Sequence, residues 1–224
     1  MFNVRRTMPA PPSLANHTSY KGQDVIDALR AMFYDKCYLC EQDFISAPEV
    51  EHFRPHNNTN ALLYGWNNLF YSCRRCNSIK SNIHTGLLDG SDPQNDVFGE
   101  IIHYAGNAAM GEVVIKASSL NPSQETINSV NLINKCFNDE NTSLKGISKE
   151  SLLEILLADY SKYLGYRNQL ADRGSTPREI QEAKDKLSVM CQVQHRFSVF
   201  WKWHVIKDTT VNRKFPNIRG ELGF

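Results

Sequence analysis

The stretch VEHFRP, residues 50–55, places a carboxylate next to an imidazole. A neutral imidazole can take a proton from water at neutral pH, because its ordinary pKa is about 6.5. Glu51 and His52 are therefore candidate catalytic residues, with His52 as the general base. A Glu-His pair on a strand is more often part of an ordinary surface, so this interpretation depends on the residues around the pair.

Two C-x-x-C pairs bracket this stretch, and they consist of Cys37, Cys40, Cys73 and Cys76. Zn²⁺ prefers tetrahedral coordination, and two tight turns of this kind can close one four-thiolate site. Because protein would fill all four positions, such a zinc ion would be structural. The rival interpretation is a thioredoxin-like redox pair, but no βαβ pattern surrounds either C-x-x-C. Two further cysteines stand in apolar patterns and are expected to be buried, namely Cys136 and Cys191.

Apolar spacing predicts the elements that position these residues. A helix is expected over residues 23–35, with a buried stripe formed by Val25, Ile26, Leu29, Met32 and Phe33. A short strand is expected around 50–53, a polar loop at 56–60, a segment at 68–72 leading into the second C-x-x-C, and a short helix over 76–80. Three prolines predict an extended arm before this module, at positions 9, 11 and 12.

The second half of the chain is predicted to be mainly helical. After the turn-rich GSDPQN (90–95), a hairpin is expected over 100–104 and 112–116. Helices are expected to begin at Asn121-Pro122, at Ser148 and at Thr176, where Pro177 and Glu179 complete a capping-box pattern. The aromatic segment FSVFWKW (197–203) is expected to pack in the core, with a base-stacking surface as the alternative. The predicted class is α+β, with an N-terminal arm (1–19), a zinc-stapled module (20–95) and a hairpin with a helical C-terminal region (96–224).

The composition limits the classes of protein to which this chain can belong. With 224 residues, of which 41% are hydrophobic, the chain can bury a substantial core. A net charge of +1 supplies no general basic field, so contact with a polyanion would need a local patch or a partner. No apolar stretch is long enough to cross a bilayer, and the N-terminus lacks the apolar core of a signal peptide. The expected location is cytoplasmic, with no membrane partner.

The pattern C-x-x-C…EHFRP…NL…C-x-x-C-N-x-x-K resembles the HNH (ββα-metal) nuclease family. The resemblance narrows further, because four segments together are similar to the PtuB nucleases of Septu-type and retron-associated antiphage systems. These segments are KCYLCE (36–41), VEHFRP (50–55), WNNLFYSCRRCNSIK (66–80) and LLDGSDP (87–93). The chain departs from the expected pattern in two places. His56 stands where a lysine is expected, and SNIHTG (81–86) follows Lys80 in place of a glycine- or lysine-rich run.

The resemblance implies a fold and a set of roles. A ββα-metal module stapled by the zinc site would carry His52 as base, while Glu51 and Asn77 would hold one Mg²⁺ or Mn²⁺ ion through hard oxygen donors. Asn68 would bond backbone across the loop and hold the His52 strand. Local positive charges that could contact phosphates are Arg54, Arg74 and Lys80.

The implied function is a metal-dependent endonuclease that acts as the effector of an antiviral defence complex. Its expected partners are a nucleic-acid substrate, an ATPase subunit of the PtuA type, and a retron reverse transcriptase with its RNA–DNA product. DNA is the favoured substrate, and RNA such as tRNA is the alternative, because this hydrolysis neither needs nor forbids a 2′-hydroxyl. The alternative from another class is a zinc-ribbon binding or assembly module without catalysis.

Overall fold

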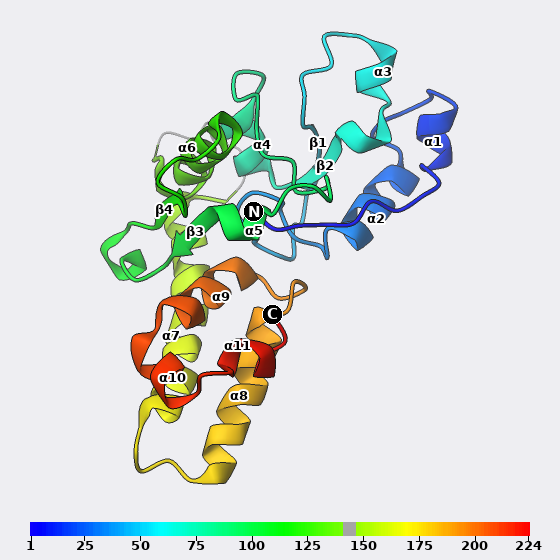
Figure 1. Ribbon diagram of the computed structural model, residues 1–224. Coiled ribbons are helices and arrows are strands. Elements are labelled where there is room, and N and C mark those ends of the chain that lie inside the picture. Colours follow the sequence, from blue (N-terminus) through cyan, green and yellow to red (C-terminus); the bar gives the residue numbers. More distant parts are fainter. Residues whose placement is uncertain (141–146) are drawn as a thin grey trace.

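The chain passes from a small strand-and-helix module at one end of the molecule to a group of packed helices at the other (Figure 1). The computed structural model describes residues 1–140 and 147–224. Its first part contains α1 (Pro12–Ala15), α2 (Gln23–Met32), β1 (Glu49–His52), α3 (Asn60–Leu63), β2 (Leu69–Ser72) and α4 (Arg74–Lys80). The middle contains α5 (Val97–Glu100), β3 (Ile101–Tyr104), β4 (Val114–Ala117) and α6 (Gln124–Asn138). The last part contains α7 (Lys149–Ala171), α8 (Pro177–Cys191), α9 (Ser198–Lys207), α10 (Thr209–Lys214) and α11 (Ile218–Glu221).

Strands β1 and β2 form an antiparallel pair, with Glu51 opposite Phe70 and His52 opposite Leu69. Strand β2 is buried along its whole length, whereas β1 is buried only at its two central residues. Helix α4 follows β2 directly and packs against β1. The strand expected around residues 50–53 and the helix expected to end at Lys80 are both present, and together they give the order strand, strand, helix.

The segment predicted to be an extended N-terminal arm, residues 1–19, contains one short helix. Residues 1–11 carry no regular secondary structure, but Pro12 begins helix α1, since the fixed backbone angle of proline suits the first helical turn. Met1 and Phe2 are buried in the core. Arg6 donates to the carbonyls of Trp66 (3.0 Å) and Leu69 (2.7 Å), so the arm is fastened to the start of β2.

Two helix boundaries differ from the predictions. Helix α2 ends at Met32 rather than at residue 35, because Tyr34 and Asp35 adopt left-handed backbone angles with φ of 57° and 55°. Helix α6 begins at Gln124 rather than at Asn121-Pro122. The Ser123 hydroxyl caps it by accepting from the Thr126 amide, and serine is a favoured N-cap residue.

The other helix starts and the hairpin are confirmed. Ser148 caps α7, and Thr176 forms the expected capping box with Glu179 at the start of α8. Strands β3 and β4 pair as an antiparallel hairpin within one or two residues of the expected ranges. The aromatic segment is mainly core, because Phe197, Phe200 and Trp201 are fully buried.

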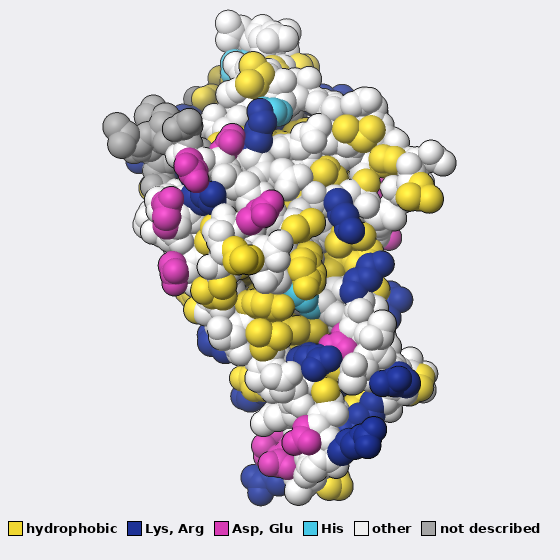
Figure 2. Space-filling view, turned by 90° about the vertical axis from the view of Figure 1, so that its left-hand side faces the viewer, with side chains coloured by type: hydrophobic (Ala, Val, Ile, Leu, Met, Phe, Trp, Pro, Cys, Tyr) yellow, Lys and Arg dark blue, Asp and Glu magenta, His cyan; other side chains and the backbone are white. Residues whose placement is uncertain are grey.

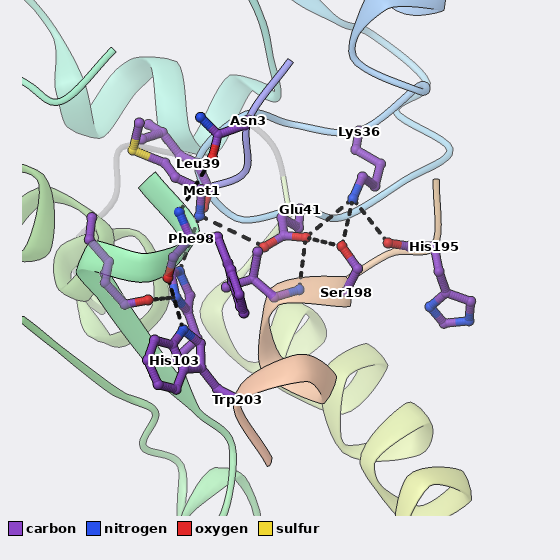
Figure 3. A network of polar contacts seen from close by, with 12 residues as sticks. Met1, Asn3, Lys36, Leu39, Glu41, Phe98, His103, His195, Ser198 and Trp203 are labelled. Atoms are coloured by element: carbon purple, nitrogen blue, oxygen red, sulfur yellow. Dashed lines mark hydrogen bonds and ion pairs between the residues drawn. The ribbon is translucent and has the colours of Figure 1, made fainter. Parts of the chain in front are cut away.

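A buried polar network joins the loop of the first C-x-x-C, residues 37–41, to helix α9 (Figure 3). Glu41 follows Cys40 directly and accepts from the Lys36 ammonium (3.2 Å) and from the Ser198 hydroxyl (3.1 Å) at the start of α9. Lys36 also donates to the carbonyl of His195 (3.0 Å). Burial alone would raise the pKa of Glu41, but Lys36, the Met1 amine and His103 together hold it at about 2. The carboxylate is therefore charged and ties residues far apart in the sequence together.

The described part of the chain is a mixed α and β structure that is mostly helical and contains small antiparallel sheets. This agrees with the predicted α+β class. Among the described residues, no helix combines the length and the apolar character needed to cross a bilayer.

Candidate metal centre and active site

Four thiols converge where the two C-x-x-C turns meet. The sulfur atoms of Cys37, Cys40, Cys73 and Cys76 all lie within 4.8 Å of one another. Zn–S bonds of about 2.3 Å in a tetrahedron place sulfur atoms about 3.8 Å apart, and the Sγ atoms of Cys40 and Cys73 are separated by 3.9 Å. The donor set and its spacing fit a four-thiolate metal site, and zinc is compatible with it.

The fold positions these thiols from two directions. The Glu41 amide donates to the Cys37 carbonyl (2.9 Å), which closes the first turn after α2. The second pair lies at the start of α4, where the Cys73 sulfur accepts from the Cys76 amide. All four side chains are buried, and burial raises the pKa of the Cys40 and Cys76 thiols. Burial thus favours the neutral thiol, whereas a bound cation favours the thiolate, because a coordinating thiol is deprotonated by the metal.

The Glu51 carboxylate faces helix α4 and pairs with Lys80. Its Oε1 atom lies 2.5 Å from the Lys80 ammonium, and the two side chains are 8% and 1% exposed. Burial raises the pKa of Glu51 to about 7, although the neighbouring ammonium opposes this rise. This pair was not predicted from the sequence. Asn77 and Lys80 lie three residues apart and so share one face of α4.

His52 lies among aromatic groups and next to a backbone carbonyl. Its ring is 4.7 Å from the ring of Tyr20 and 4.7 Å from that of His56. The Nε2 atom is 3.1 Å from the Leu63 carbonyl oxygen. Because a carbonyl can only accept, this contact assigns the proton to Nε2 and leaves the lone pair on Nδ1. Burial lowers the pKa of His52, so the ring is neutral at pH 7.

Glu51 and His52 have different neighbours, as adjacent residues of a strand should. The carboxylate contacts α4, whereas the imidazole contacts residues before α2 and around α3. Tyr20, His56 and the Leu63 carbonyl were not predicted as parts of the site. No local sequence pattern could have identified them, because the fold brings them together from separate loops.

Asn68 ties the end of β1 to the loop that precedes β2. Its Oδ1 atom accepts from the Arg54 amide (2.8 Å), and its Nδ2 group donates to the carbonyls of Arg54 (2.9 Å) and Leu62 (2.9 Å). The side chain therefore bonds backbone across the loop, as expected. Leu62 precedes the residue whose carbonyl orients His52, so Asn68 also fixes that carbonyl.

Replacing Asn68 with alanine is expected to lower the free energy of unfolding by about 2–3 kcal/mol. The change leaves three part-buried backbone groups without their partner, and each such loss costs about 1 kcal/mol. Denaturant unfolding of the zinc-loaded chain measures this difference. The matched control is Asn67→Ala, because Asn67 is exposed and its side chain makes none of these bonds. A loss below about 0.5 kcal/mol in both variants would contradict the assignment.

Asn77 lies on α4, one turn before Lys80, and is half-buried. In the described part of the chain its side-chain amide makes no hydrogen bond, so its oxygen remains available to a ligand. The structure thus brings α4, which carries Asn77, against β1, which carries Glu51. The joint roles of these two residues as cation ligands stay predictions.

The residues expected to contact phosphates are placed differently from one another. The Arg54 side chain is exposed, and that of Arg74 is 53% exposed beside Glu49, at 3.2 Å. Lys80 is buried against Glu51 instead of facing solvent. The neighbouring Arg75 is also buried and donates to the carbonyls of Cys136 and Asp139, which gives it a structural role. Contacts of Arg54, Arg74 and Lys80 with nucleic acid stay predictions.

An open pocket of about 730 Å³ lies next to the site. Arg6, Arg54, Trp66 and Asn68 contribute to its wall, whereas Glu51 and His52 do not.

The site therefore combines a buried thiolate cluster with a carboxylate and an oriented imidazole on a strand–strand–helix unit. Part of the chain is related in sequence to Septu proteins. It is 39% identical over 80 residues to the Septu protein PtuB of Bacillus mycoides (strain KBAB4), and this match covers 29% of the chain and 27% of that protein. It is 39% identical over 71 residues to the Septu protein PtuB of Bacillus thuringiensis, covering 30% of the chain and 28% of that protein. The similarity thus spans less than a third of these curated relatives. No family profile matches the chain, and no solved structure matches it.

Proposed function

We propose that this protein is a metal-dependent endonuclease of the HNH type that hydrolyses phosphodiester bonds in nucleic acid as the effector of a Septu-like antiviral defence complex. The observation that carries this proposal is the neutral His52 ring, which the Leu63 carbonyl orients on a strand stapled by four thiols. The similarity to Septu proteins PtuB supports the defence context.

The chemistry follows from the residues at the site. His52 accepts a proton from the attacking water at Nδ1, because Nε2 already donates to Leu63. Glu51 and Asn77 would hold one Mg²⁺ or Mn²⁺ ion, whose charge stabilises the phosphoryl oxygens when it is bound. Zinc in the four-thiolate site would have no open coordination position, so its role would be structural and not catalytic.

The near-neutral charge suits a nuclease that depends on a partner for its substrate. At a net charge of +1, the chain has no general attraction for a polyanion. Exposed Arg54 and Arg74 flank the site at the ends of β1 and α4, and they offer local contacts to phosphates. A partner that delivers nucleic acid to this edge would therefore control the activity.

The leucine-rich faces of the C-terminal helices do not offer a surface for binding a partner protein. Leu152, Leu153 and Leu156 are buried and belong to the core. Figure 2 shows hydrophobic side chains gathered in the middle of the face that carries β4 and α10, with a histidine among them. A cleft of about 300 Å³ with aromatic walls, including Tyr104, which is 41% exposed, lies between β3, α7 and α10. We place the ATPase partner of the PtuA type on this face. A retron reverse transcriptase with its RNA–DNA product is a further proposed partner.

Incubation of the complex with labelled plasmid, single-stranded DNA and tRNA tests the nuclease and its substrate. Cleavage is expected with Mg²⁺ or Mn²⁺ and not with EDTA, because water activation needs charge compensation at the phosphate. DNA cleavage would support the favoured substrate, and tRNA cleavage would assign the same chemistry to RNA. Metal-independent cleavage, or none on any substrate, would contradict the proposal.

A further inference from the structure

The Lys80 ammonium lies inside a set of oxygen atoms. Its Nζ atom is 2.5 Å from Glu51 Oε1, 2.9 Å from the carbonyl oxygen of His52 and 3.5 Å from the carbonyl oxygen of Ser81. One carboxylate and two carbonyl oxygens are also the donor types that hard divalent cations prefer. The ammonium therefore occupies surroundings that would equally suit a metal ion.

The local fold explains why the ammonium lies there. Lys80 is the last residue of α4, where a positive charge is favoured by the partial negative charge of the helix end. Ser81 then turns the chain away with a φ of 44°. The lysine side chain is only 1% exposed, and a buried charge needs a partner of opposite sign. Glu51 is that partner, so the ammonium and the carboxylate stabilise each other.

We propose that Lys80 is the resident counter-ion of Glu51 in the metal-free protein, and that a divalent cation reaches Glu51 only when the Lys80 ammonium leaves this carboxylate. The inference rests on the proposed function, in which Glu51 holds the catalytic cation. Two positive charges on one buried carboxylate repel each other strongly, because little solvent lies between them. Lys80 thereby keeps the Glu51 carboxylate occupied until a divalent cation displaces the ammonium.

The displaced ammonium would then be available to a phosphate of the bound nucleic acid. Lys80 would then be buried in the free protein and contact phosphate in the complex. Lys80 is a positioning residue in this scheme, because it acts through the carboxylate that it releases.

Titration of the zinc-loaded full chain with Mn²⁺ alone, followed by calorimetry and by the electron paramagnetic resonance of free Mn²⁺, tests the inference. The variant is Lys80→Met, which keeps most of the side-chain volume and removes the charge. Mn²⁺ is expected to bind the variant at least tenfold more tightly than the wild type, since no ammonium competes. Glu51→Gln is expected to abolish this binding in both backgrounds.

Labelling of the wild type keeps the inference testable where Lys80→Met does not fold. An amine-reactive reagent, with mass spectrometry of the peptides, is expected to leave Lys80 unmodified without Mn²⁺ and to modify it when Mn²⁺ is added. Lys36 is the internal control, because it is equally buried and pairs with Glu41 at 3.2 Å, in the core. Lys36 should stay unmodified in both conditions.

The outcomes separate the two proposals. If the wild type binds Mn²⁺ through Glu51 as tightly as Lys80→Met does, and Lys80 stays protected, the inference about Lys80 is wrong and the nuclease proposal stands. If neither protein binds Mn²⁺ in a Glu51-dependent way, both are wrong. Tighter binding by the variant, or exposure of Lys80 on Mn²⁺ addition, supports the inference.

Discussion

Replacing Cys73 with serine is expected to remove the bound metal and unfold the strand–strand–helix module. Metal binding by four buried thiolates is worth about 10–16 kcal/mol in small zinc domains at pH 7. That is as large as the total stability of most single domains, which is about 5–15 kcal/mol. Cys73 also caps α4 through its sulfur, so the variant loses both the metal and the helix start. Elemental analysis should fall from one zinc per chain to none, with loss of the cooperative thermal transition.

Cys191→Ala is the matched control for this experiment. Cys191 is buried like Cys73, with 1% exposure, but lies on α8 outside the thiol cluster. The control should keep one zinc per chain and lose only about 1 kcal/mol of stability, because a small buried group is removed. If Cys73→Ser behaves like Cys191→Ala, the four thiols do not hold a structural metal ion.

Features with local signals could be predicted from the sequence. The capping box of Thr176 and Glu179 depends on residues three positions apart, and it is present at the start of α8. Each C-x-x-C turn brings its own two thiols close together, which the sequence alone predicts. That the two turns meet at one site was predicted only by assuming that they share a metal ion, and the four thiols do converge. Helix α6 begins later than expected because Ser123 competes successfully as a cap.

Features that depend on contacts through space could not be predicted. Lys80 was expected to face a phosphate, and only the packing of α4 on β1 reveals its partner Glu51. The proton position on His52 depends on the Leu63 carbonyl, which any residue at position 63 would supply. Lys36 and Glu41 likewise meet Ser198 across more than 150 residues of sequence, so neither composition nor periodicity could show this link.

Replacing His52 with alanine is expected to reduce the cleavage rate by a factor of about 10² to 10⁴, which is the usual contribution of a positioned general base. The half-buried side chain makes one hydrogen bond, to Leu63, so the fold and the zinc content should persist. Single-turnover cleavage at saturating Mg²⁺ measures the loss. Because burial lowers the pKa of His52 below its ordinary value, the wild-type ring is already the free base at pH 7, and raising the pH further should not increase the wild-type rate through this group.

His195→Ala is the control, because His195 is also half-buried and its ring contacts a backbone carbonyl, that of Arg196, at 2.7 Å. It lies before α9, away from β1, so this variant should cleave at the wild-type rate. Equal activity of both variants would remove the general base from the mechanism and leave a zinc-stapled binding or assembly module as the better description. A loss confined to His52→Ala, with zinc content and folding unchanged, separates a catalytic role of the imidazole from a structural one.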